Sequence, residues 1–88
     1  MIFAVTVEIR GLAGIADPEG QTIERALPAL GFAGVRDVHV GKVVTFELEA
    51  PDEADARRRV EEMCHRLLAN PVIQRFEADV RPAGGAGS

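Results

Sequence analysis

The feature that most constrains the fold is a strict alternation of apolar and polar residues near the start of the chain. Over residues 2–10, every second side chain is large and apolar: Phe3, Val5, Val7 and Ile9. A period of two is typical of a β-strand with one face in a core and the other in solvent. The same period returns at residues 43–50 and 73–81. We therefore expect several strands that share one apolar face.

A segment whose apolar residues recur with the period of an α-helix lies between the first two of these strands. Asp17-Pro18 predicts its start, because Asp accepts hydrogen bonds from free first-turn amides and Pro fits the first helical position. Gly31 predicts its end. Pro28 lies inside the pattern and predicts a kink or an early end, since it lacks an N–H and crowds the preceding turn. The apolar stripe of this helix consists of Ile23, Ala26, Leu27 and Leu30.

A second helix follows Pro51-Asp52, with Asp52 as its N-cap. Acid-first pairs at i, i+4 predict an exposed side, since this order stabilises a helix. The pairs are Glu53–Arg57, Asp55–Arg59 and Glu62–Arg66. The predicted buried stripe consists of Ala56, Val60, Met63, Cys64 and Leu67.

The segment between the two helices predicts a hairpin. Residues 35–41 and 43–50 resemble two strands joined at Gly41-Lys42, where Gly can adopt a positive φ. The complete order is then β-α-β-β-α-β. This order predicts an α+β, ferredoxin-like two-layer sandwich, with a four-stranded antiparallel sheet and both helices on one face. We expect a single domain over residues 1–81 and a flexible tail over residues 82–88.

Helices on one face leave the other face of the sheet open. Its predicted residues are mixed polar and small rather than uniformly charged, so this face and the sheet edges are candidates for self-association. They are Thr6, Glu8, Val43, Thr45, Glu47, Arg75 and Glu77.

Composition excludes several function classes. The net charge is −4, the basic residues are nine Arg and the single Lys42, and Trp and Tyr are absent. Nucleic-acid binding is therefore not expected, because it needs a basic face. No apolar run is long enough for a membrane helix. The single cysteine, Cys64, cannot form a disulfide within the chain, which fits a protein of the reducing cytoplasm.

No catalytic, cofactor or metal site is expected. Cys64 lies on the predicted buried stripe, where a thiol behaves as a small apolar residue. Its neighbour His65 points about 100° away on a helix, so the two do not chelate together. The loop Gly11-Leu-Ala-Gly14 lacks the Lys-Ser/Thr of a phosphate-binding loop.

Several segments together resemble the PurS family, over about residues 2–80. They are Asp17-Pro18-Glu19-Gly20, Ala26-Leu27, Leu30-Gly31-Phe32, Val35-Arg-Asp-Val38, Val40-Gly41-Lys42 and, most specifically, the run from Met63 to Ile73. The resemblance implies a ferredoxin-like subunit that forms dimers, sometimes paired into tetramers. It implies a bridge between a glutaminase subunit, PurQ, and an ATP-using synthetase subunit, PurL. The assembled enzyme makes formylglycinamidine ribonucleotide in purine synthesis, and its catalytic groups belong to the partners.

Two residues of the predicted hairpin are candidates for a partner contact. Lys42 is the only lysine, and a turn lysine is free to meet an acidic patch or a phosphate. His39 stands where the family pattern has a basic residue, and its charge titrates near neutrality.

Two other functions remain open on the same topology. A ligand-binding module of the ACT type also dimerises, but it is expected beside a catalytic or DNA-binding domain. A hydrolase of the acylphosphatase type needs an Arg-bearing phosphate cradle and a positioned Asn. Arg10 precedes a Gly-rich loop, but the only Asn is Asn70, in a helix-ending Asn-Pro.

Overall fold

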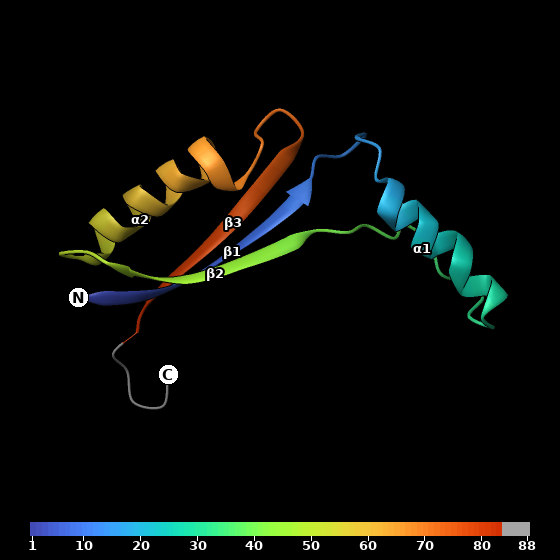
Figure 1. Ribbon diagram of the computed structural model, residues 1–88, viewed down its shortest axis with the longest axis horizontal. Helices are drawn as coiled ribbons and strands as arrows, with labels where there is room; N and C mark the ends of the chain where they lie inside the picture. Colours follow the sequence, from blue (N-terminus) through green and yellow to red (C-terminus); the bar gives the residue numbers. More distant parts are fainter. Residues whose placement is uncertain (84–88) are drawn as a thin grey trace.

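A computed structural model describes residues 1–83 (Figure 1). The sheet has three antiparallel strands in the order β2-β1-β3. In chain order the elements are β1 (Ile2–Gly11), α1 (Pro18–Ala29), β2 (Lys42–Glu49), α2 (Glu53–Met63), the π-helix η1 (Cys64–Leu68) and β3 (Gln74–Pro82). The predicted α+β class and antiparallel sheet are confirmed, while the number of strands and the position of one helix differ.

The central strand β1 organises the core. Val5 lies opposite Phe46 of β2 and Val80 of β3, so these side chains share the face that α2 covers. The apolar alternation of β1 is confirmed, because its four large residues are almost fully buried. The core consists of Phe3, Val5, Val7, Ile9, Ala50, Ala56, Val60, Cys64, Ala69 and Val80.

The predicted strand over residues 35–41 is wrong, and with it the hairpin at Gly41-Lys42. This segment joins no sheet: Asp37 has a φ of 58°, and side chains of the α1 region bind the amides of Val38 and Val40. Gly41 is needed for close approach rather than for a turn. A Cβ there would lie 2.6 Å from the carbonyl oxygen of Ile9. Lys42 is the first residue of β2.

The prediction that both helices cover one face is also wrong. Only α2 packs on the sheet, over β1 and β3, whereas α1 projects from one end of it (Figure 1). Residues 12–41, called the arm below, extend the described chain to 51 × 34 × 14 Å. The radius of gyration is 16.9 Å, and a compact chain of this length has about 12 Å.

Pro28 acts close to the end of α1. The helix ends at Ala29, one residue beyond Pro28, and three short-range bonds close it. The N–H groups of Leu30 and Phe32 both donate to the carbonyl of Leu27, and Gly31 follows with a φ of 96°. The expected early end and the glycine stop are both found.

The stripe of α2 is confirmed for Ala56, Val60 and Cys64 but is wrong for Leu67, which is 82% exposed. The cause is η1. A π-turn has more residues per turn than an α-helix, so it rotates the following side chains out of the α-helical phase. Leu68 packs against the core in place of Leu67. All three predicted ion pairs on the exposed side form.

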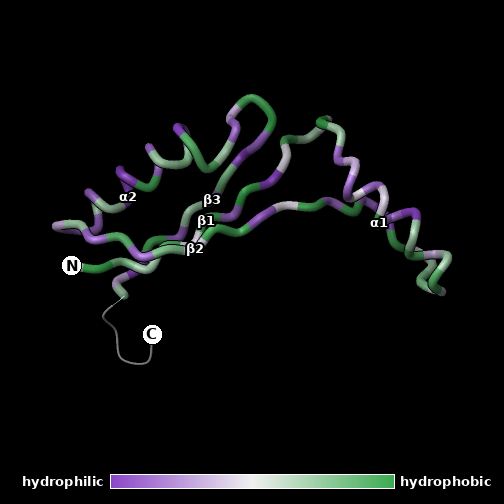
Figure 2. Tube along the Cα trace, viewed as in Figure 1, coloured by the Kyte–Doolittle hydropathy of each residue, from purple (hydrophilic) through white to green (hydrophobic). Residues whose placement is uncertain are grey.

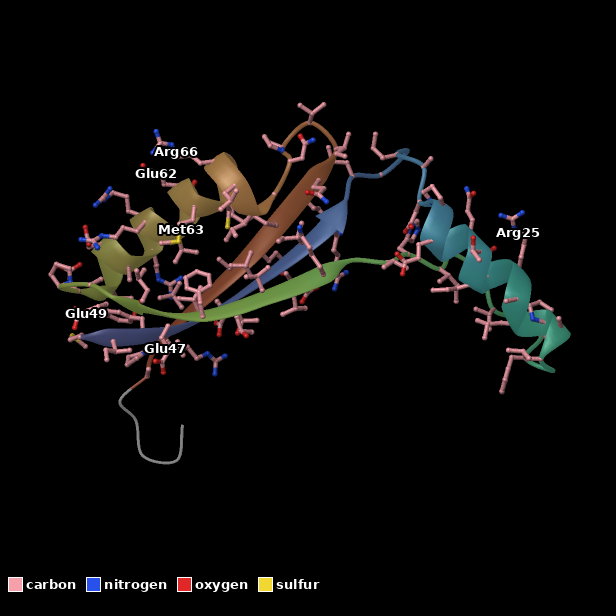
Figure 3. All side chains as sticks on the ribbon, in the orientation of Figure 1. Arg25, Glu47, Glu49, Glu62, Met63 and Arg66 are labelled. Atoms are coloured by element: carbon pink, nitrogen blue, oxygen red, sulfur yellow. The ribbon has the colours of Figure 1, made fainter. Side chains whose placement is uncertain are left out.

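The open face of the sheet carries the residues that the sequence predicts. Thr6 lies opposite Thr45, and Glu8 lies opposite Val43 and Glu77. Figure 3 shows Glu47 and Glu49 on the side of β2 that faces away from α2. At the C-terminal end, β3 includes Pro82, and the N–H of Ala83 donates to the carbonyl of Ile2. The rest of the predicted tail, residues 84–88, lies outside the described residues.

Candidate functional site

A cleft of about 920 Å³ lies where the arm leaves the sheet, and it contains both predicted contact residues. We call it the hinge cleft. The end of β1, the start of β2, the start of β3 and the start of α1 form its walls. Its ionisable residues are Glu8, Arg10, Asp17, Glu19, His39, Lys42 and Arg75.

Asp17 fixes the geometry of this cleft. Its Oδ1 accepts the N–H of Gly20 at 2.9 Å, and its Oδ2 accepts the N–H of Val40 at 2.8 Å. The first bond caps α1. The second joins the start of the helix to residues 35–41, which lead back to the sheet and are called the returning segment below. These two backbone bonds hold the pKa of Asp17 below its ordinary value, since they stabilise the carboxylate. The sequence predicts the cap but not the second bond.

Glu24 makes a similar contact about two turns further along α1. Its Oε1 accepts the N–H of Val38 at 3.1 Å. Gly20 allows the approach, because a Cβ there would lie 2.4 Å from the carbonyl oxygen of Val38. Helix and returning segment therefore form one hydrogen-bonded unit.

His39 lies on the outer side of this unit. Its imidazole is 75% exposed, and its Nδ1 lies 3.5 Å from Oδ2 of Asp17. At this exposure the pair contributes little to stability. The ring lines the cleft and remains largely exposed, so a partner can reach it.

Lys42 lies on the opposite wall. It pairs with Ile9 in the sheet register, so it begins the row of β2 residues on the α2 side. Among residues 1–83, no carboxylate forms an ion pair with it. Its ammonium group is thus available to an incoming anion. The structure brings Lys42 and His39 to one cleft, although the hairpin that predicted this is absent.

Sequence reasoning missed two arginines of the cleft. Arg10 and Arg75 face each other across β1 and β3 on the open face. Like charges in this register repel, and Glu8 relieves the repulsion by forming an ion pair with Arg10. Arg75 has no ion pair in the described part of the chain. Finding this cluster from sequence requires the β1–β3 register, which residue patterns do not supply.

Cys64 lies apart from the cleft, inside the core under α2. Burial, and secondarily the charge of Glu61, raises the pKa of its thiol, so the nucleophilic thiolate is disfavoured. His65 does not act as its base. Its ring makes an edge contact with Phe76, with centroids 5.3 Å apart. The buried structural role predicted for Cys64 is consistent with this geometry.

Metal and membrane sites have no support within residues 1–83. No three metal-ligating side chains of these residues come together. No helix among them is both long and apolar enough to cross a bilayer. The charged side chains that line the hinge cleft suit recognition by charge and hydrogen bonds.

Comparison with known proteins decides the family. The family model for PurS, phosphoribosylformylglycinamidine (FGAM) synthase, matches residues 4–82. The chain belongs to the PurS family. PurS of Methanocaldococcus jannaschii is 43% identical over 79 residues, which cover 90% of this chain and 95% of that protein. PurS of Archaeoglobus fulgidus is 45% identical over 76 residues, which cover 86% and 92%.

Solved PurS structures have the same architecture, extended arm included. Bacillus subtilis PurS has a TM-score of 0.82 at 32% identity, over 91% of this chain and 99% of that chain. A chain of the structure of PurLQS from Thermotoga maritima has a TM-score of 0.83 at 30% identity, over 91% and 98%. Since these scores cover nine-tenths of the chain, the departures from a compact sandwich belong to the PurS fold.

Proposed function

We propose that this chain is a non-catalytic assembly subunit of phosphoribosylformylglycinamidine synthase in purine synthesis. It bridges the glutaminase subunit PurQ and the synthetase subunit PurL, so that ammonia released by one reaches the other. The observation that carries this proposal is the match to a PurLQS chain over nearly its whole length. A subunit of the same length and shape fits the same position in an assembly.

The chemistry of the chain supports an assembly role. Its one thiol is buried and held in the neutral form. The hinge cleft offers cations instead, with Lys42 and Arg75 lacking ion pairs among the described residues. A cleft of this kind recognises carboxylates or phosphates on a partner.

Lys42 and His39 form the partner contact in this proposal. They lie three residues apart in the chain, on either side of Val40, whose N–H the Asp17 carboxylate accepts. A rigid arrangement suits an adaptor, because it sets the relative position of the proteins that it holds.

Self-association is part of the same proposal. The chain forms a homodimer or a dimer of dimers, since the open face of the sheet and α1 are both uncovered in the single chain. The assembly works in the cytoplasm, where the lone thiol stays reduced.

Reconstitution tests the bridging role. PurQ and PurL from the same organism are mixed with and without this chain, and turnover is measured with glutamine and, separately, with ammonium. The chain should raise glutamine-dependent turnover and leave ammonium-dependent turnover unchanged, because only glutamine requires transfer between subunits. Equal glutamine-dependent turnover in its absence would refute the proposal. Binding of an amino acid to the free chain would instead favour a ligand-binding module.

A further inference from the structure

Two arginines form a like-charge pair at the end of the sheet from which the arm leaves. Arg10 of β1 and Arg75 of β3 are direct partners in the antiparallel register, so both side chains lie on the open face. Their Cβ atoms are then about 5 Å apart, and like charges at this separation destabilise the pair. Figure 2 shows this end of the sheet, where hydrophilic ends of β1 and β3 meet the apolar loop that follows β1.

The neighbouring carboxylates do not neutralise this pair. Glu8 forms an ion pair with Arg10, and it lies opposite Glu77, which is a second like-charge pair. Arg75 forms no ion pair in the described part of the chain. A guanidinium group has five N–H donors, and a bidentate carboxylate accepts two of them. Both arginines therefore keep donors for an anion placed between them.

The loop after β1 adds backbone donors. Of the amides in residues 12–16, those of Leu12 and Ile15 donate to carbonyls. The successive N–H groups of Ala13 and Gly14 have no acceptor within the part of the chain that the structure describes. Gly14 has a φ of 84°. Successive N–H groups in such a turn form concave donor sets that bind anions.

These donors belong to one cleft rather than to a flat surface. The hinge cleft of about 920 Å³ is lined by Arg10, Ala13, Lys42 and Arg75. Its volume is in the range of small-molecule sites, about 300–1,000 Å³. Lys42 approaches from the α2 side of the sheet, since it pairs with the inward residue Ile9. The arginines approach from the open face, so cations reach the cleft from both faces.

The donor set fits a phosphate group better than a carboxylate. A carboxylate has two oxygens and one charge, so a single guanidinium group satisfies it in a bidentate pair. A phosphate monoester has three terminal oxygens and close to two charges at neutral pH. Two guanidinium groups, a lysine and a set of backbone amides match that larger demand.

The cleft suits binding rather than hydrolysis. A phosphate hydrolase on a related topology needs an Arg-bearing cradle and an asparagine that positions water. Arg10 and the loop after it supply the first part, but Asn70 is the only asparagine of the chain. Its Oδ1 accepts the N–H of Val72 at 3.1 Å, and Asn70 does not line the cleft. The motif is therefore retained without the group that would make it catalytic.

We propose that the Arg10–Arg75 end of the hinge cleft binds the dianionic phosphate group of a small molecule. The two guanidinium groups bind terminal oxygens from the open face, the amides of Ala13 and Gly14 bind a further oxygen, and Lys42 adds charge from the α2 side. The bound anion also removes the repulsion between the arginines, so it stabilises the junction of sheet and arm. This site goes beyond the bridging role, which does not require it.

Titration of the unaltered, isotope-labelled chain tests the site by NMR at about pH 7.5, where the phosphate is mostly dianionic. The probes are ribose 5-phosphate, inorganic phosphate, ribose and acetate at constant ionic strength. We expect saturable shifts of the Ala13 and Gly14 amides and of the Nε–H signals of Arg10 and Arg75. Both phosphates should cause these shifts, and tighter binding of ribose 5-phosphate would identify a sugar phosphate rather than free phosphate as the ligand. Equal shifts with acetate, or shifts that do not saturate, would overturn the proposal.

A matched pair of variants gives a second readout. Arg75 and Arg81 are exposed residues of the same strand and the same face, at opposite ends of the sheet. Arg75→Gln should weaken phosphate binding by about tenfold or more, because it removes a charge-assisted hydrogen bond. Arg81→Gln should leave it unchanged, since Arg81 pairs with Asp79 away from the cleft. Equal affinities of the two variants would overturn the proposal. The readout uses this chain alone, so its result is separate from that of reconstitution with PurQ and PurL.

Discussion

The carboxylate of Asp17 joins two parts of the chain that lie 23 residues apart. It accepts the N–H of Gly20 at the start of α1 and the N–H of Val40 on the returning segment, at 2.9 and 2.8 Å. One side chain therefore both begins the helix and sets the direction of the arm relative to the sheet.

Replacement of Asp17 should loosen the arm and spare the sheet. Asp17→Ala removes both acceptors, whereas Asp17→Asn keeps one carbonyl oxygen. We expect amide exchange of Val40 and of the first turn of α1 to accelerate in the order wild type, Asn, Ala. Exchange in β1 should not change, and it provides the internal control. Uniform acceleration across arm and sheet would contradict a local role for Asp17.

Acid should weaken the arm. The backbone bonds lower the pKa of Asp17, so the folded arm binds a proton less readily than the unfolded chain does. The stabilisation is complete above about pH 4 and is lost as the pH falls through the lower, folded pKa. NMR titration should show the Gly20 and Val40 amides shifting together in this range. Asp17→Asn should lack that transition, and its persistence in this variant would exclude Asp17 as the cause.

Gly20 should tolerate no side chain. In a helix, Gly→Ala ordinarily stabilises by about 1 kcal/mol. Here the Cβ would lie 2.4 Å from the carbonyl oxygen of Val38, and overpacking costs about 1–3 kcal/mol. The clash exceeds the gain, so Gly20→Ala should lower the helix content of the arm. Gly11→Ala is the control, because its Cβ would meet its nearest atom at 3.9 Å. An arm stabilised by Gly20→Ala would show that the segments do not touch in solution.

The hinge cleft gives a salt-dependent prediction. Lys42→Glu should weaken binding to PurQ or PurL more at low than at high salt, since it replaces an attraction by a repulsion that salt screens. Arg81→Glu makes the same charge change at the other end of the sheet, where Arg81 pairs with Ala4. Sedimentation of the mixed subunits should separate the two variants. Matching losses of binding would assign the effect to net charge rather than to the cleft.

Cys64 should be dispensable for turnover. Cys64→Ala should leave glutamine-dependent turnover of the reconstituted enzyme nearly intact, because the thiol is buried and neutral. Cys64→Ser should lower stability further, by about 1–3 kcal/mol for a buried hydroxyl without a partner. Urea denaturation measures the second effect. Loss of turnover in a folded Cys64→Ala chain would make the residue catalytic.

The sequence predicts the parts of this fold that depend on local periodicity. The four apolar residues of β1 and the stripe of α2 up to Cys64 are such parts, because each period reports directly which face is buried. The strand at residues 35–41 has a similar pattern but no strand partner. The amides of Val38 and Val40 instead bind the side chains of Glu24 and Asp17. Alternation reports that a side is covered, but it does not report what covers it.

The remaining differences have the same origin in tertiary structure. Leu67 follows the α-helical phase in the sequence, yet η1 changes the phase after Met63. The contact of Asp17 with Val40, which lies between His39 and Lys42, joins residues 23 positions apart. The pair Arg10–Arg75 depends on a register that links distant strands. None of these relations has a local signal.

The central position of β1 also sets the order in which the chain can fold. Phe3 pairs with Pro82, so the strand that is synthesised first has its partner at the opposite end of the sequence. Contacts of such long separation form slowly, because a long loop must close before any of them stabilises the product. During synthesis β1 can form only a two-stranded ribbon with β2, which is marginal on its own. The complete sheet and its core therefore form together, after the last strand has left the ribosome. A partner that binds the sheet can do so only once synthesis is finished.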